Sequence, residues 1–179
     1  MKILTAILPL LAWSIVASAG MLMPLSLERL TIEAQLVLHG TVLSQSCQRD
    51  PEGRIYTKIE LEVAEVWKGT LTNRTFIIVH GGGVIGDRRS SVSHQVEFAT
   101  SEEVVAFLTV NRRGEGVCLG LSQGKFHVWQ DAVSKQKRAR NPFHGTSEQA
   151  AAGIATQASN RIASLSLAEL EQRVRGGSR

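Results

Sequence analysis

The chain has 179 residues, with 20 Lys and Arg against 16 Asp and Glu, and 43% of its residues are hydrophobic. This length is sufficient for one domain with a hydrophobic core. After the N-terminal segment, no stretch has the roughly 18 to 20 uncharged, apolar residues of a membrane-spanning helix, so the sequence predicts no such span.

The N-terminus has the pattern of a secretory signal peptide. Lys2 precedes an apolar run from Ile3 to Val16, and the small residues of 17–19 follow it. We expect cleavage after Ala19, which would give an extracytoplasmic protein, periplasmic or secreted, of residues 20–179. That location excludes ATP and nicotinamide chemistry, and it permits a disulfide.

Charge and pattern divide the expected mature chain near Asp131. Residues 20–131 carry eleven Lys and Arg against thirteen Asp and Glu, whereas residues 132–179 carry eight against three. The β-branched alternation also ends near Trp129. We therefore predict a β-barrel domain over 20–131, a basic and largely irregular linker over 132–164, and a C-terminal helix and tail over 165–179.

The predicted elements begin with a short helix capped by Ser26. Alternation over 36–42 and over 55–63 predicts two strands of a long hairpin, joined by the turn residues 50–53. Further strands are predicted at 75–80, 104–110, 117–121 and 125–129, with Gly124 in a turn between the last two. At the C-terminus, Ser166 and Glu169 have the spacing of a capping box, and Leu165 and Leu170 have that of a hydrophobic staple.

The order of short motifs from Leu25 to Trp129 carries a resemblance to known proteins. The motifs are Leu-Ser-Leu-Glu-Arg-Leu at 25–30, Val-Leu-His-Gly-Thr-Val at 37–42, Glu-Val-Trp-Lys-Gly at 65–69, the glycine-rich segment 81–86, Val-Val-Ala-Phe-Leu at 104–108 and Gly-Leu-Ser-Gln-Gly-Lys-Phe at 120–126. This pattern resembles a group of uncharacterised secreted bacterial proteins. Their β domain is similar to the OB-type barrels of the netrin and metalloproteinase-inhibitor (NTR/TIMP-like) class.

The resemblance implies a mainly β fold, namely a small five- to six-stranded OB-like barrel with a short N-terminal helix and a C-terminal helix. It does not carry over an inhibitory mechanism. Metalloproteinase inhibitors of that class approach the metal of their target with an N-terminal Cys, and this chain has no Cys before Cys47.

Cys47 and Cys118 are predicted to form a disulfide, because an even pair in an oxidising compartment is more often bridged than free. Closing a loop of about 70 residues would contribute about 4 kcal/mol in the chain-entropy account. The alternative is two separated, buried thiols.

The stretch from Gly81 to Gly86 matches G-x-G-x-x-G, but its context excludes a dinucleotide site. That fingerprint places a pyrophosphate at a helix N-terminus, whereas residues 87–98 show no helical stripe. We predict an exposed loop over 81–96 that binds a partner. Its candidate binding residues are His80, Gly81, Gly82, Gly83, Gly86, Asp87, Arg88, Arg89 and His94.

No motif for catalysis, a metal or a cofactor is found, so we expect neither a metal nor a cofactor. No two of the five histidines form an H-x-x-x-H pair. His39 and His127 are predicted at exposed or singly hydrogen-bonded strand positions, and Glu102 and Glu103 are interpreted as solvated surface. A dispersed catalytic site stays open, because a fold can assemble one from distant residues.

The run 135–140 is the strongest electrostatic feature, and its candidate anion contacts are Lys135, Lys137, Arg138 and Arg140. They could contact anionic lipid headgroups, acidic glycans or nucleic acid. Nucleic acid is not expected, since the run lacks interleaved aromatic residues and the protein is predicted to be exported. We favour a solvated linker.

These observations favour a secreted or periplasmic, non-enzymatic binding module for a protein partner, such as an exported protease. One alternative is an exported hydrolase in which His80, Asp87 and His94 converge. The other is a cell-envelope structural protein that contacts the envelope surface through its basic tail.

Overall fold

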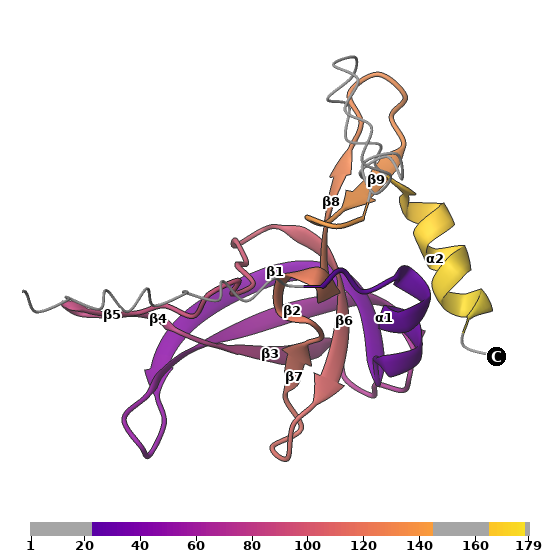
Figure 1. The fold of residues 1–179 in the computed structure, drawn as a ribbon. Helices are drawn as coiled ribbons and strands as arrows, with labels where there is room; N and C mark the ends of the chain where they lie inside the picture. Colours follow the sequence, from indigo (N-terminus) through magenta and orange to yellow (C-terminus); the bar gives the residue numbers. More distant parts are fainter. Residues whose placement is uncertain (1–22, 145–164, 178–179) are drawn as a thin grey trace, which may run out of the picture.

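A computed structural model describes residues 23–144 and 165–177 (Figure 1). The predicted signal peptide, its cleavage site after Ala19 and residues 145–164 of the predicted linker lie outside the described residues. The described chain is mainly β, with ten strands and two α-helices. No helix within these residues is long and apolar enough to cross a membrane.

The predicted N-terminal helix and long hairpin are confirmed. Helix α1 (Leu27–Glu33) is capped by Ser26, whose Oγ accepts a hydrogen bond from the backbone N–H of Arg29 at 3.1 Å. It leads into β1 (Leu36–Arg49), which pairs antiparallel with β2 (Ile55–Lys68). Each strand has 14 residues, so the hairpin extends beyond the alternation that predicted it.

The other strands connect the two edges of this hairpin. Strand β3 (Thr75–Gly81) pairs with β2, and β6 (Glu103–Val110) pairs with β1. The short β7 (Gly116–Cys118) pairs antiparallel with β6 and parallel with β3. Strand β8 (Lys125–Gln130) extends the sheet from β6 to β9 (Lys137–Arg140) and β10 (Leu165–Ser166).

The strand predicted at 117–121 ends early, at Cys118. Gly120 and Leu121 both have φ of 60°, a left-handed conformation that a strand cannot accommodate. The chain then forms the 3₁₀ helix η1 (Leu121–Gly124), so Gly124 lies between the two strands as predicted, at the end of a helical turn.

Strand β6 is apolar without alternation because both of its faces are buried. Val104 and Leu108 face the core inside the strands, together with Leu38, Ile59 and other side chains of β1 to β3. Val105 and Phe107 face a second core, which α1 and α2 cover. A strand buried on both faces reads as a continuous hydrophobic run, which explains the Val-Val-Ala-Phe-Leu motif.

The C-terminal helix α2 (Leu167–Gly176) packs on this second core and lies beside α1 (Figure 1). Its predicted cap is confirmed, because Ser166 Oγ accepts a hydrogen bond from the backbone N–H of Glu169 at 3.1 Å. Leu170 and Val174 are fully buried against the core. The helix is therefore part of the same packed body as the strands.

Candidate functional site

The predicted loop at 81–96 contains a small hairpin of its own. Strands β4 (Gly83–Ile85) and β5 (Arg88–Ser90) form a separate two-stranded sheet, joined by a turn at Gly86 and Asp87. Gly86 has φ of 55°, as the first position of a type II′ hairpin turn requires. Backbone pairing therefore orders residues 81–96 at their centre, and we call this segment the binding hairpin only after the partner binding expected from the sequence.

The glycines of the segment allow the binding hairpin to lie against the end of the β1–β2 hairpin. A Cβ at Gly83 would lie 2.6 Å from Cys47 Sγ and 2.7 Å from Thr57 Oγ1. Thr57 Oγ1 donates a hydrogen bond to the carbonyl of Gly82 at 2.8 Å, and the N–H of Val84 donates to Cys47 Sγ at 3.4 Å. The glycine run thus serves close packing, and no helix follows it.

A cavity of about 330 Å³ lies beside the binding hairpin, and both His80 and His94 line it. The His80 ring stacks on Phe98 with 6.5 Å between ring centroids. Asp87 does not line this cavity, because it lies in the β4–β5 turn. The arrangement therefore brings together only two members of the hydrolase set, and no cluster of three metal-ligating side chains exists among residues 23–144 and 165–177.

The predicted disulfide is absent, and both cysteines are free. Cys118 lies opposite Leu108 in the sheet, and Leu108 lies opposite Leu36 at the start of β1. Cys47 lies opposite Thr57 of β2, and Thr57 lies opposite His80 of β3, the strand that pairs with β7, so about three strand spacings of roughly 4.8 Å separate the two cysteines. Disulfides need Cα atoms within about 7 Å, so the sheet register holds the two thiols apart. Cys118 is buried, whereas Cys47 is partly exposed.

The basic run is not a solvated linker at its centre, because it forms β9. Lys137 Nζ donates to Glu103 Oε1 at 2.7 Å, and the Arg140 guanidinium lies over the Trp129 ring at 5.1 Å from its centroid. Arg138 is half-buried and pairs with Asp131 at 4.0 Å. Of the four candidate anion contacts, these three are oriented by intramolecular contacts, while Lys135 is exposed in the β8–β9 turn.

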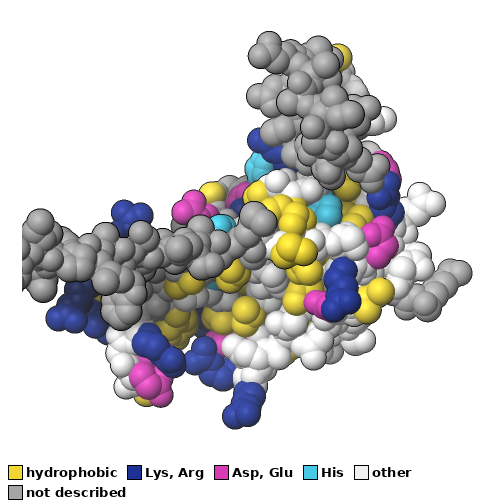
Figure 2. Space-filling view, viewed as in Figure 1, with side chains coloured by type: hydrophobic (Ala, Val, Ile, Leu, Met, Phe, Trp, Pro, Cys, Tyr) yellow, Lys and Arg dark blue, Asp and Glu magenta, His cyan; other side chains and the backbone are white. Residues whose placement is uncertain are grey.

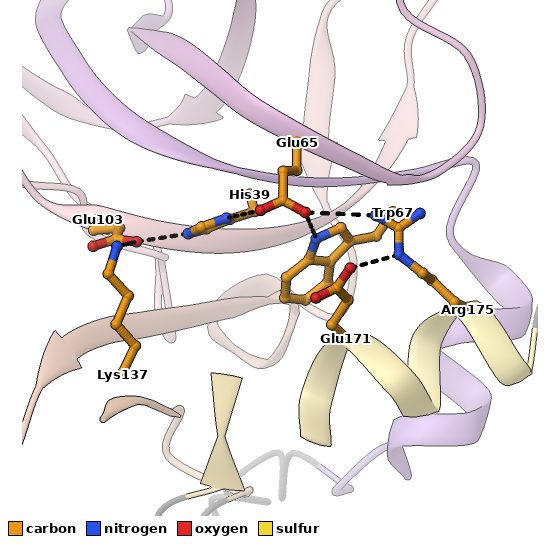
Figure 3. A network of polar contacts seen from close by, with 7 residues as sticks. All are labelled: His39, Glu65, Trp67, Glu103, Lys137, Glu171 and Arg175. Atoms are coloured by element: carbon orange, nitrogen blue, oxygen red, sulfur yellow. Dashed lines mark hydrogen bonds and ion pairs between the residues drawn. The ribbon is translucent and has the colours of Figure 1, made fainter. Parts of the chain in front are cut away.

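A polar network around the buried His39 joins the sheet to α2 (Figure 3). His39, which is 6% exposed, contacts Glu103 Oε1 through Nε2 at 2.7 Å and lies 3.7 Å from Glu65 Oε1 through Nδ1. Glu65 also accepts a hydrogen bond from Trp67 Nε1 at 3.3 Å and pairs with Arg175 of α2 at 3.5 Å. His39 is singly hydrogen-bonded, as predicted, and the network gives it a structural role between strands and helix.

Glu102 is the centre of a second polar cluster. Its carboxylate accepts hydrogen bonds from Lys125 Nζ at 2.7 Å, His127 Nδ1 at 2.9 Å and the N–H of Ala99 at 3.0 Å. Burial raises the pKa of Glu102, but the hydrogen bonds from Lys125 and Ala99 outweigh it, and the pKa lies below its ordinary value of 4.5.

The interpretation of Glu102 and Glu103 as solvated surface is wrong, since their side chains are only 11% and 25% exposed. Burial also raises the pKa of Glu103, and the hydrogen bonds from Lys137 and His39 bring it below 4.5. No local signal reveals the contacts with charged and imidazole side chains, because those partners are distant along the chain. His127, which is exposed and makes one hydrogen bond, agrees with its prediction.

Comparison with known proteins does not assign a function to this chain. No protein-family model matches the chain, and no curated protein matches it significantly.

Proposed function

We propose that this chain is an exported, non-enzymatic binding module that engages a protein partner through the binding hairpin. The observation that carries the proposal is the surface of β4 and β5. Val84 and Val92 are 54% and 45% exposed, and Arg88 and Arg89 are exposed beside them. Exposed apolar side chains next to arginines are typical of protein-binding surfaces.

The position of the binding hairpin supports this role. It lies at one end of the molecule, where Figure 2 shows Lys and Arg side chains near the place of β4 and β5 in Figure 1. Within the described residues, β5 pairs only with β4, so one edge of this short sheet is open to a further strand. An open edge and a cationic surface favour an extended, acidic segment of a partner.

The inferred architecture is an OB-like barrel with the binding hairpin as one of its loops. Support comes from the pairing order, in which β1 pairs with β2, β2 with β3, β3 with β7, β7 with β6, and β6 again with β1. Such barrels commonly bind through loops beside the strands. The N-terminal pattern supports export, and the resemblance to the NTR/TIMP-like class favours an exported protease as the partner.

The test compares two hairpin tips that carry the same types of side chain. One variant combines Val84→Asp, Arg88→Glu and Arg89→Glu. The control combines Val133→Asp and Lys135→Glu in the β8–β9 turn, where Val133 is 93% exposed. Partners are captured by cross-linking from periplasmic and secreted fractions of the exporting cell, and the captured protein is then purified and titrated against each variant.

We expect the β4–β5 variant to lose at least tenfold in affinity, which corresponds to about 1.4 kcal/mol, while the control binds as the unaltered protein does. Circular dichroism and unfolding midpoints establish that both variants are folded. Equal binding by both variants would refute the proposed surface. Capture of a substrate that the protein converts would favour the hydrolase alternative.

A further inference from the structure

A second cavity, of about 460 Å³, lies between the start of β8, the end of β9 and the segment before β6. Its walls include Val96, Glu97, Ser122, His127, Arg140 and Pro142. The volume is in the range of small-molecule sites, and such sites combine apolar walls with a few polar groups that fix the ligand.

Two members of the cluster at Glu102, Lys125 and His127, line this cavity. Lys125 Nζ donates to Glu102 and to the carbonyl of Glu97 at 2.5 Å. With the Lys125 ammonium also 4.9 Å from the centroid of the Phe98 ring, its charge is compensated locally. Lys125 and Glu102 therefore neutralise each other at the cavity, and little of their charge is left to attract a ligand.

The same cluster fixes the role of His127. A carboxylate only accepts hydrogen bonds, so Nδ1 of His127 carries the proton that it donates to Glu102. In the neutral ring, Nε2 then has a free lone pair and accepts a hydrogen bond. Within the described part of the chain, Nε2 makes no hydrogen bond, so it is available to a ligand that carries a donor.

Two further charged groups at the cavity have no ion-pair partner among the described residues. Arg140 stacks on Trp129 and pairs with no acid, and Glu97 is exposed and pairs with no base. They line one cavity without pairing with each other. Arg140 lies directly opposite His127 in the β8–β9 register, a position where side chains are about 5 Å apart at Cβ, so one small ligand can reach both.

We propose that this cavity binds a free amino acid with an apolar side chain. The α-carboxylate pairs with the Arg140 guanidinium, whose planar donors match a carboxylate. The α-ammonium donates to Glu97 and to Nε2 of His127. The apolar side chain contacts Val96 and Pro142. A zwitterion of this kind complements both unpaired charges and the His127 acceptor, which a simple anion does not.

The test uses the full protein with L-leucine and two analogues that each lack one charge. 4-Methylpentanoate lacks the ammonium group, and L-leucinamide lacks the carboxylate. Binding is measured by calorimetry and by NMR shifts of the His127 ring and the β8–β9 amides, and the other standard amino acids are screened in the same way. Arg140→Gln and Glu97→Gln remove the two charges, and Lys135→Gln is a matched control that removes a cation from the β8–β9 turn.

We expect leucine or another apolar amino acid to bind saturably, and each single-charge analogue to bind at least tenfold more weakly. Arg140→Gln should abolish the preference for leucine over leucinamide, and Glu97→Gln should reduce the preference for leucine over 4-methylpentanoate. Lys135→Gln should bind as the unaltered protein does. The proposal is overturned if no standard amino acid binds, if 4-methylpentanoate binds as well as leucine, or if both cavity variants bind normally while folded.

Discussion

Replacing Gly83 by alanine should destabilise the protein because the new methyl group has no space. Its Cβ would lie 2.6 Å from Cys47 Sγ and 2.7 Å from Thr57 Oγ1, and φ at this position is 140°. Overpacking costs about 1–3 kcal/mol, and a disfavoured backbone conformation costs about 1–3 kcal/mol more. We expect the free energy of unfolding to fall by about 3 kcal/mol, measured by urea denaturation with the fluorescence of the buried Trp67.

Gly86→Ala is the matched control, since φ there is 55° and no atom lies within 4 Å of the added Cβ. Gly86→Ala should lower the free energy of unfolding only through the disfavoured backbone conformation of the alanine, by about 1–2 kcal/mol. Cys47→Ala removes the sulfur that the new methyl group would meet, so Gly83→Ala should be milder in that background by at least about 0.5 kcal/mol. Equal losses for the two glycine variants, or no coupling to Cys47, would show that close packing does not explain the glycine run.

Three further predictions concern acid stability, thiols and the C-terminal helix. The folded-state pKa values of Glu102 and Glu103 lie below 4.5. The ionised carboxylates therefore stabilise the fold above about pH 4.5, and this stabilisation is lost as the pH falls through the lowered pKa values. In an acid titration of the unfolding midpoint, Glu102→Gln should flatten this part of the curve. Burial raises the pKa of Cys118 to about 12, so iodoacetamide should label only Cys47 in the native protein. In denaturant without reductant it should label both thiols, which intact-mass measurement would detect. If labelling in denaturant required a reductant, the two thiols would not be free. Leu170→Ala should cost about 2–5 kcal/mol in chemical denaturation, and a loss below 1 kcal/mol would mean that α2 adds little to the core.

The sequence predicts those elements whose evidence is local. Alternation over 55–63 indicates β2 because one face of that strand is buried and the other is wet. The serine caps of both helices were predictable for the same reason, since each cap contacts a backbone N–H three residues away. Strand β9 could not be predicted, because only Ala139 of its four residues is buried and the charged side chains are held by distant partners.

Glu102, just before β6, and Glu103, its first residue, show why the candidate sites could not be predicted without the fold. Glu102 and Glu103 are neighbours in the sequence, but successive side chains at a strand point to opposite faces. Glu102 therefore holds Lys125 and His127 at the proposed amino-acid cavity, while Glu103 holds His39 and Lys137 in the network that reaches α2. His127 and Lys137 lie on the paired strands β8 and β9, so the cavity and the docked C-terminal helix depend on the same strand pair. A change that displaces α2 should then disturb the cavity through β9, whereas the combined change of Val84, Arg88 and Arg89 should act on the binding hairpin alone. This difference separates the two proposed binding surfaces experimentally.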